Sequence, residues 1–262
     1  MELRFYQIDA FTDTLFKGNP ACVVPLERWL PDALLFKIAQ ENAVPETAFF
    51  VEEEASFHLR WFTPDIEMDL CGHATLATAH CLKTLIKDSR SHFLFNTKSG
   101  LLRVRALEDG YQMELPARMP VTASLPDAIK KALSIAPQAV YKARDYVLVY
   151  RSEQEILDLQ INRAQLDQIN LDPGGVVVTA KGDHCDFVSR FFTPQATILE
   201  DPVTGSAHCS LVPFWAEQLQ KNELDAQQRS QRGGLLKCSL VGDKVVLVGQ
   251  ARTYAVGSLW TE

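Results

Sequence analysis

The chain has 262 residues, with 26 Lys and Arg against 33 Asp and Glu, and a formal net charge of −7. Hydrophobic residues make up 47% and charged residues 23%, which excludes a disordered, collagen-like or low-complexity chain. The acidic balance argues against a nucleic-acid or anionic-membrane partner, because both require clustered positive charge. No apolar run reaches the ~18 residues of a membrane span, and the N-terminal segment lacks the apolar core of a signal peptide. We therefore expect a cytoplasmic protein.

The first half of the chain is predicted to consist mainly of strands. Alternating apolar and polar residues predict strands at residues 3–11, 47–51, 58–62, 92–95, 101–104 and 111–115. An amphipathic pattern that begins with a proline predicts a helix over residues 31–42. Four prolines and one short helical stretch at 128–133 indicate that residues 115–137 form a linker. In the second half, strands are predicted at residues 147–150, 176–178, 187–192 and 245–248.

Two segments carry no charged side chain at all. Residues 72–82 and 205–215 contain no Asp, Glu, Lys or Arg, so a helix in either place must be buried on every side. In a half made mostly of strands, such a helix is expected to be wrapped by a curled sheet. Pro213 should kink the second helix or end its first part.

An internal repeat indicates that the two halves are copies of each other. RWFTP at residues 60–64 recurs as RFFTP at residues 190–194, half a chain later. Cys71 follows the first copy at the spacing at which Asp201 follows the second. A glycine then opens each uncharged segment, with residues 202–204 as an apparent insertion in the second copy.

The repeat and the element pattern together predict an α+β fold of two pseudo-symmetric lobes. Residues 1–117 are assigned to the first lobe and residues 118–262 to the second, with the last strand free to return to the first. Each lobe is expected to be a curled, mostly antiparallel sheet around a central helix.

Six cysteines occur, and none forms a Cys-X-X-Cys pair, so neither a zinc ribbon nor a thioredoxin-type site is indicated. Without an export signal the thiols are expected to be reduced. Five of them are interpreted as small buried hydrophobes, and Cys71 is the exception.

The start of each central helix is a candidate anion site. The first turn of a helix carries unpaired N–H groups and a partial positive charge. Gly72 and Gly205 allow a ligand to approach closely, and His73 and Ser206 follow with side-chain donors. A carboxylate of a small metabolite is the natural ligand for two such helix starts. The alternative is that both glycines serve only tight packing of helix against sheet.

Two carboxylates are candidates for proton transfer. Glu46 leads into an apolar strand, where it lies either at a wet strand end or in a dry pocket that would suit a general base. Asp201 precedes a proline and either caps N–H groups in its loop or orients and exchanges a proton.

The histidines near these segments admit several roles. His73 could act as an acid, a base or a donor to the substrate, whereas His208 is interpreted as a core or pocket histidine. His80 lies seven residues after His73 on the same helical face, but no acidic third ligand follows at helical spacing. We therefore expect no metal site.

Five motifs occur in order along the chain: Phe16-Lys17-Gly18-Asn19-Pro20, Pro45-Glu46-Thr47-Ala48-Phe49, Cys71-Gly72-His73-Ala74-Thr75, Glu200-Asp201-Pro202-Val203-Thr204-Gly205-Ser206-Ala207-His208 and Arg232-Gly233-Gly234. Together they resemble the PhzF family of phenazine-biosynthesis-type isomerases, which is related in fold to diaminopimelate epimerase. The resemblance covers essentially the whole chain, and its fourth motif is the most specific.

The resemblance implies a two-lobed, cofactor-free isomerase with its active site between the lobes. The founding member isomerises trans-2,3-dihydro-3-hydroxyanthranilate, and the glutamate that matches Glu46 moves a proton between two carbons. The resemblance makes Glu46, His73 and Asp201 the expected catalytic residues. The expected substrate-binding residues are Asn19, Gly72, Gly205 and Ser206. It also favours a homodimer and a small carboxylate substrate, with no metal.

Two alternatives stay open at this point. The related epimerases and racemases use two opposed cysteines, and this sequence keeps Cys71 but has Asp201 at the position that the spacing matches to the second thiol. A carboxylate-centred mechanism is therefore preferred over an amino-acid epimerase or racemase that uses Cys71. The other alternative is a non-catalytic small-molecule binding protein on the same fold.

Overall fold

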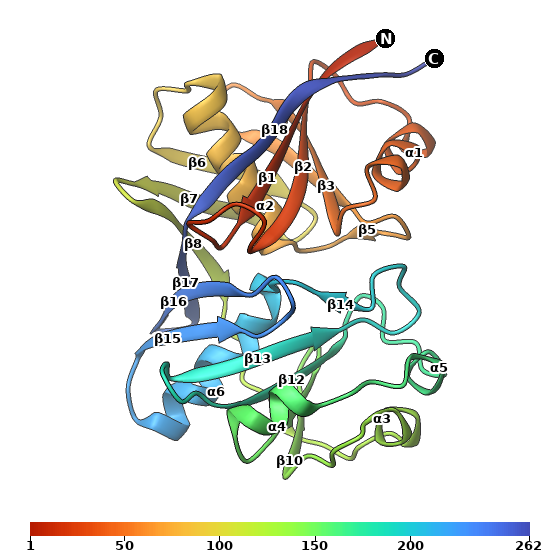
Figure 1. Ribbon diagram of the computed structural model, residues 1–262. Helices are drawn as coiled ribbons and strands as arrows, with labels where there is room; N and C mark the ends of the chain where they lie inside the picture. Colours follow the sequence, from red (N-terminus) through yellow and green to blue (C-terminus); the bar gives the residue numbers. More distant parts are fainter. The chain divides into compact units, whose positions relative to one another are not determined.

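The computed structural model describes residues 1–262 and divides them into two compact units (Figure 1). Unit 1 consists of Met1–Glu114 and Leu247–Glu262, and unit 2 consists of Leu115–Val246. The chain leaves unit 1 within strand β8 (Gly110–Pro116) and returns to it within β17 (Lys244–Gly249). The C-terminal strand therefore belongs to the unit that holds the N-terminus.

Unit 1 is a sheet of mostly antiparallel strands with two α-helices. Its elements are β1 (Glu2–Ala10), β2 (Asn19–Leu26), α1 (Asp32–Asn42), β3 (Glu46–Glu52), β4 (Phe57–Phe62), β5 (Glu67–Met68), α2 (Gly72–His80), β6 (His92–Thr97), β7 (Gly100–Leu107), β8 and β18 (Ala251–Trp260). Strand β1 pairs antiparallel with both β18 and β2, so the two ends of the chain share one sheet. The pairs β2–β3 and β4–β6 are parallel.

Unit 2 repeats this order. Its elements are β9 (Val121–Thr122), α3 (Asp127–Ala132), β10 (Ala139–Lys142), β11 (Tyr146–Val149), α4 (Glu153–Asp158), α5 (Arg163–Leu166), β12 (Val176–Lys181), β13 (Phe187–Phe192), β14 (Glu200–Asp201), α6 (His208–Leu219), β15 (Glu223–Gln228), β16 (Gly234–Val241) and the first part of β17. The parallel pairs β11–β12 and β13–β15 stand where β2–β3 and β4–β6 stand in unit 1. The repeat inferred from RWFTP and RFFTP is thus a repeat of strand order and direction.

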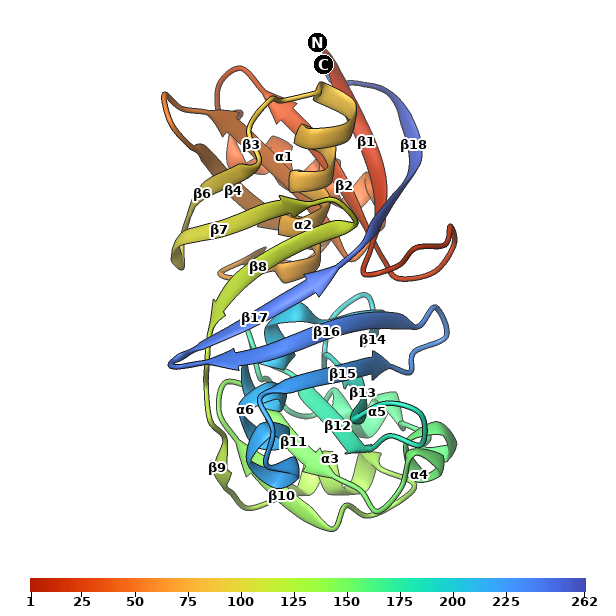
Figure 2. The same ribbon diagram turned by 90° about the vertical axis from the view of Figure 1, so that its left-hand side faces the viewer.

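Helix α2 lies inside the curled sheet of unit 1, as its lack of charge predicts. All nine of its residues are buried, and it contacts β1, β2, β3, β7 and β18 (Figure 2). Small side chains let the strands approach it from several directions. Past His80 the helix widens into a π-helix, Cys81–Ile86. The predicted α+β class with a central helix is confirmed.

Helix α6 is the counterpart of α2 in unit 2. A 3₁₀ turn, Gly205–Ala207, precedes it, and nine of its residues are buried. The helix runs through Pro213 to Leu219, so of the two outcomes expected at this proline, a kink or an end, the end is wrong. Proline has no N–H to donate to the carbonyl four residues earlier. That carbonyl, on Cys209, accepts the backbone N–H of Arg118 at 2.8 Å instead.

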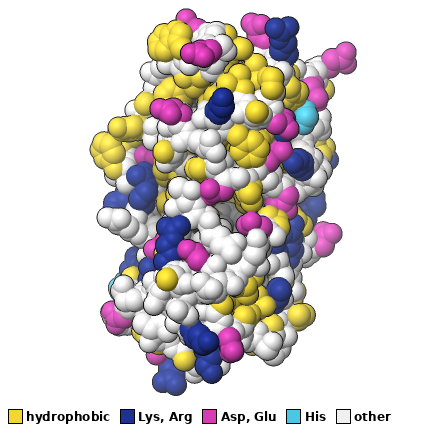
Figure 3. All heavy atoms as spheres, turned by 90° about the vertical axis from the view of Figure 1, so that its right-hand side faces the viewer, with side chains coloured by type: hydrophobic (Ala, Val, Ile, Leu, Met, Phe, Trp, Pro, Cys, Tyr) yellow, Lys and Arg dark blue, Asp and Glu magenta, His cyan; other side chains and the backbone are white.

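The surface shows charges of both signs, and the helices are short. On the face drawn in Figure 3, Lys and Arg side chains lie interspersed with Asp and Glu side chains. None of the helices is both long and apolar enough to span a bilayer. All six cysteines are free thiols, and each is buried except the half-buried Cys185.

Candidate active site

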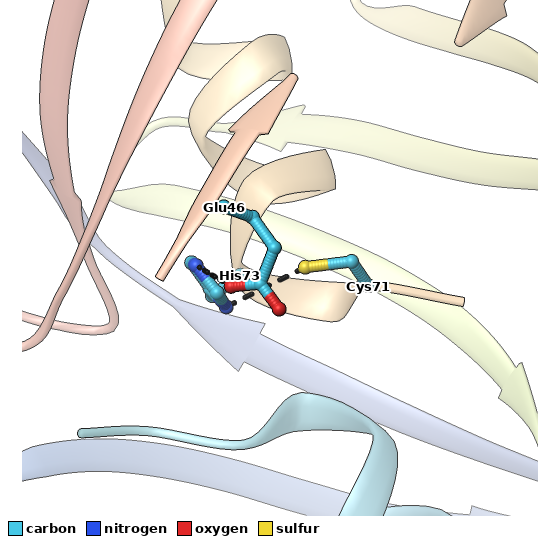
Figure 4. Close-up of side chains that lie close together, drawn as sticks. All are labelled: Glu46, Cys71 and His73. Atoms are coloured by element: carbon cyan, nitrogen blue, oxygen red, sulfur yellow. Dashed lines mark hydrogen bonds and ion pairs between the residues drawn. The ribbon is translucent and has the colours of Figure 1, made fainter. Parts of the chain in front are cut away.

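The site residues of unit 1 stand where three elements begin. Asn19 is the first residue of β2 and Glu46 the first of β3, and these strands run parallel, with Ala21 opposite Glu46. Cys71 is the N-cap residue of α2, and His73 lies in its first turn. Because parallel strands begin at the same edge of a sheet, the side chains gather there. Figure 4 shows Glu46, Cys71 and His73 pointing toward one another.

The contacts of the His73 ring define its neutral tautomer. The amide nitrogen of Asn19 lies 3.1 Å from Nδ1. An amide N–H can only donate, so in this orientation of the amide Nδ1 accepts and the ring proton is on Nε2. Nε2 lies 3.2 Å from Oε2 of Glu46, an approach whose angle is not that of a hydrogen bond. A proton donor of the ring therefore stands beside the carboxylate.

Burial controls the charge of this pair. His73 is 2% exposed and Glu46 is 8% exposed. Burial lowers the pKa of His73 to about 3, so the imidazole is uncharged at neutral pH. His73 thus offers Glu46 an N–H dipole without a positive charge. The glutamate lies in the dry surroundings, and not at a wet strand end.

The N-terminus of α2 points its backbone donors at the same place. Cys71 is extended, with φ −136° and ψ 109°, and its side chain makes no capping hydrogen bond. The N–H groups of the first turn, at Gly72 and His73, are therefore not capped by the residue that usually does so. Gly72 has no side chain to keep a ligand away, so this end of the helix suits a negative group.

Cys71 adds a thiol to the group. Its Sγ lies 3.6 Å from Nδ1 of His73, and it is buried. Glu46, Cys71 and His73 each offer one ligand atom within 4.8 Å of the others, a donor set that zinc accepts. The ring, however, faces the thiol and the amide of Asn19 with Nδ1 and faces Glu46 with Nε2. A metal held by all three would have to displace one of these contacts.

Two more buried histidines, His80 and His208, have structural partners. The ring nitrogens of His80 lie 3.1 Å from the hydroxyl of Tyr111 and 2.9 Å from that of Thr253, which ties α2 to β8 and β18. His80 is thus engaged away from His73, and the two do not form a ligand pair. Nδ1 of His208 lies 2.9 Å from the backbone oxygen of Thr204, so it donates there. Burial lowers the pKa of both rings to about 4.

In unit 2, the candidate residues lie in and after β14. Asp201 is the last residue of this strand, and Gly205 and Ser206 form the buried 3₁₀ turn before α6. Between them stands Thr204, whose hydroxyl donates to Oδ2 of Asp201 at 2.5 Å. Gln228, at the end of β15, accepts the N–H of Thr204 at 2.8 Å and donates to the backbone oxygen of Asp201 at 2.7 Å.

The structure corrects the residue equivalence between the two copies. Arg60 forms a two-pronged hydrogen bond with Glu67, at 2.7 and 3.0 Å, and Arg190 does the same with Glu200, at 2.8 and 3.0 Å. The strand registers agree, because the phenylalanine that ends β4 pairs with Glu67 and the one that ends β13 pairs with Glu200.

Counting onward from these glutamates changes which residue of the second copy corresponds to Cys71. The glycine follows at the same distance in both copies, so Cys71 corresponds to Thr204, and Asp201 corresponds to Met68. The three extra residues of the second copy lie within the loop 195–199, and not at 202–204. The matching of Cys71 with Asp201 was therefore wrong, because equal spacing from the proline ignored a longer loop.

Sequence reasoning missed Thr204 and Gln228 altogether. Thr204 lies within a recognised motif, so its place before Gly205 was a usable signal. Nothing in the sequence around Gln228 indicates a buried amide at 1% exposure. Asn19 is expected to bind substrate; it is fully buried, and its amide nitrogen contacts Nδ1 of His73.

Three comparisons with known proteins, by family model, by sequence and by structure, find the same family over nearly the whole chain. The family model described as "Phenazine biosynthesis-like protein" (PhzC-PhzF) matches residues 8–257. A Pseudomonas aeruginosa protein named as an uncharacterized isomerase is 47% identical over 99% of both chains. The crystal structure of a PhzF-family protein from Enterococcus faecalis has a TM-score of 0.93 and 41% identity, and covers 100% of both chains.

More distant structures share the fold alone. A hydroxyproline epimerase from Agrobacterium vitis has a TM-score of 0.65 at 10% identity, covering 98% of this chain and 92% of the other. With nearly the whole chain matched by the family model and by relatives above 40% identity, this protein belongs to the PhzC/PhzF family of phenazine biosynthesis-like proteins, several of whose bacterial members are named isomerases.

Proposed function

We propose that this protein is a cofactor-independent isomerase that moves a proton between two carbons of a small carboxylate-bearing metabolite. One observation carries the proposal: the buried carboxylate of Glu46 lies 3.2 Å from Nε2 of an uncharged His73, a residue in the first turn of α2. Relatives named isomerases in the same family support the reaction class.

In the proposed reaction Glu46 is the general acid and base. Its carboxylate removes a proton from one carbon, the electron pair shifts along the substrate, and the same carboxyl returns the proton to another carbon. No oxidant or reductant is consumed. The dry surroundings keep water from competing for the proton.

The other groups of unit 1 stabilise charge. The N–H groups of Gly72 and His73 at the helix start are fixed donors for negative charge on the substrate, which such a proton transfer needs. The Nε2–H of His73 lies beside Glu46, and its dipole favours the negative charge of the carboxylate. In unit 2, Asp201, Gly205 and Ser206 are expected from the family resemblance to take part in the same reaction, and this stays a prediction.

A second candidate function rests on Cys71. Its thiol lies 3.6 Å from Nδ1 of His73, so an epimerase or racemase reaction at an α-carbon has a candidate acid or base in place. The corrected equivalence counts against the two-thiol form of this reaction, because the position that matches Cys71 is the hydroxyl-bearing Thr204.

The proposal is tested by a screen for proton exchange. Cyclic and amino-acid carboxylates are incubated with the protein in deuterated water, and deuterium incorporation is followed by NMR and mass spectrometry. Exchange at a carbon, accompanied by a new isomer and lost in Glu46→Gln, is the expected result. Exchange confined to an α-carbon with inversion, lost in Cys71→Ala instead, would establish the second candidate.

A further inference from the structure

We propose that Glu46, Cys71 and His73 form a binding site for a single zinc ion, and that the bound ion reversibly inhibits the isomerase. The inhibition rests on the proposed function, because it takes Glu46 as the group that moves the proton. The ion site itself rests on the geometry of unit 1, to which all three residues belong and in which they lie together (Figure 4).

The three side chains are of the types that zinc binds. One carboxylate oxygen of Glu46, Sγ of Cys71 and one ring nitrogen of His73 lie within 4.8 Å of one another. Thiolate, imidazole and carboxylate are the three kinds of side-chain ligand found in zinc sites. Magnesium and calcium prefer sites made of oxygen alone, so the thiol favours zinc over both.

The separation of Sγ and Nδ1 fits a tetrahedral zinc ion. Zinc lies about 2.3 Å from a thiolate sulfur and about 2.0–2.1 Å from an imidazole nitrogen, so at a tetrahedral angle these two ligand atoms are about 3.6 Å apart. In the structure, Sγ of Cys71 lies 3.6 Å from Nδ1 of His73. Both residues stand at the start of α2, whose backbone holds them at this spacing. An ion can therefore bridge them with little movement.

The tautomer of His73 suits the same role. Nδ1 carries the lone pair, because the amide nitrogen of Asn19 donates to it at 3.1 Å. A histidine that binds a metal usually donates its other ring N–H to a carboxylate or a carbonyl. Nε2 of His73 already lies 3.2 Å from Oε2 of Glu46. Rotation about the side-chain bonds of Glu46 would bring its carboxylate to the ion as the third ligand.

The ion must compete with Asn19 for Nδ1. The net contribution of one hydrogen bond corresponds to roughly a twofold to tenfold change in an equilibrium constant, so the amide of Asn19 lowers the affinity for zinc by that factor. The expectation of no metal came from the spacing of His73 and His80, and this pair does not form. The proposed site uses the thiol and the glutamate in place of His80.

Binding of the ion would stop the proton transfer. The zinc ion displaces the thiol proton of Cys71, so a zinc–sulfur bond forms, the sulfur–hydrogen bond breaks and one proton enters the solvent. No electron is transferred. The carboxylate of Glu46 then donates its lone pair to the ion and cannot take a proton from carbon. A chelator that removes the ion would reverse the inhibition.

The test uses the full-length protein, freed of metal and kept reduced. Cobalt(II) is the spectroscopic probe, because a cobalt–thiolate bond gives a near-ultraviolet band. Competition with a chromogenic chelator gives the affinity for zinc. The variants are Cys71→Ala, His73→Ala and Asn19→Ala. Cys22→Ala is the matched control, because Cys22 is a second buried thiol of unit 1, 2% exposed against 4% for Cys71.

We expect the wild type to bind one zinc ion, release one proton and show the cobalt–thiolate band. Cys71→Ala should lose the band, and Cys71→Ala, His73→Ala and Glu46→Gln should each weaken zinc binding by more than the ~10- to 100-fold that a lost second-shell partner costs. Asn19→Ala should bind roughly twofold to tenfold more tightly. Cys22→Ala should bind as the wild type does. Zinc should abolish deuterium exchange in the wild type, and a chelator should restore it.

Separate results would overturn the site and the inhibition. Zinc binding that is absent, or unchanged in Cys71→Ala, would refute the site, and an active metal-free enzyme would then leave the proposed function intact. Faster exchange with zinc bound would refute inhibition. If the metal-free protein exchanges no proton on any substrate, the proposed function fails, and the cobalt band and the zinc affinities of the variants still decide whether the site exists.

Discussion

The Glu46→Gln substitution keeps the size and shape of this side chain but removes its ability to accept a proton from carbon. Glu46 is 8% exposed, and its Oε2 lies 3.2 Å from Nε2 of His73. The amide oxygen of the glutamine can occupy the place of Oε2 beside the Nε2–H. The packing around the site should therefore persist, with a change in the free energy of unfolding of about 1 kcal/mol or less.

The kinetic effect should be much larger than the effect on stability. A positioned general acid or base contributes about 10²- to 10⁴-fold to a reaction rate. The same carboxyl here removes the proton and returns it, so both steps lose their catalyst. We expect kcat to fall by at least about 10³-fold, which corresponds to about 4 kcal/mol at ~1.4 kcal/mol per factor of ten.

The assay is deuterium incorporation from solvent, measured with the substrate that the exchange screen identifies, together with thermal unfolding of the same samples. Glu52→Gln is the matched control, because Glu52 ends the same strand but is exposed and paired with Arg90. An exposed ion pair contributes little, so this variant should keep both rate and stability. A Glu46→Gln enzyme that exchanges at nearly the wild-type rate would refute the assignment.

Three further predictions concern the groups around Glu46 and the buried histidines. Asn19→Asp places an acceptor at Nδ1 of His73, so the ring proton should move from Nε2 to Nδ1, which ¹⁵N NMR of the ring detects; an unmoved proton would contradict the contact. Burial lowers the pKa of His73 to about 3 and that of His80 and His208 to about 4. The unfolded chain, with histidine pKa near 6.5, therefore binds protons that the folded chain does not, and stability present above pH 6.5 should be lost progressively toward pH 4, at up to ~1.4 kcal/mol per pH unit for each histidine. The urea midpoint should be lower at pH 5 than at pH 7, less so in His80→Gln, and equal midpoints would contradict this. Cys71→Ala should keep exchange within about tenfold of wild type if the carboxylate carries the reaction, whereas loss of all exchange would favour the thiol.

The elements that could be predicted were those whose pattern follows from burial on one or all sides. Helix α2 was recognisable because no charged residue interrupts residues 72–82, and β13 was predicted with its observed bounds, Phe187–Phe192. Strand β2 was missed, because Pro20 and Pro25 argue against a strand with neighbours on both sides. It nevertheless pairs with β1 and β3.

The candidate site likewise has residues that the sequence indicates and contacts that it does not. Glu46 follows Pro45 and His73 follows Gly72, so their residue types and their neighbours indicate both as site residues before any contact is known. The contact of Asn19 with His73 brings together residues 54 positions apart, and that of Gln228 with Thr204 joins positions 24 apart. Such pairs depend on how strands are registered, which a single sequence does not fix.

The duplicated frame explains how two helix starts of different chemistry can stand at the same position in their units. In each unit an arginine donates two hydrogen bonds to a glutamate. The same arginine lies over the phenylalanine two residues after the arginine. The guanidinium carbon of Arg60 is 5.0 Å from the ring centre of Phe62, and that of Arg190 is 4.9 Å from the ring centre of Phe192. These bonds fix the short strand that precedes each helix, independently of the side chains at the helix start. The side chains at the N-cap and in the first turn are then not needed to hold this strand in place. One copy can carry a thiol and an imidazole where α2 begins directly, and the other a hydroxyl beside a carboxylate where a 3₁₀ turn precedes α6.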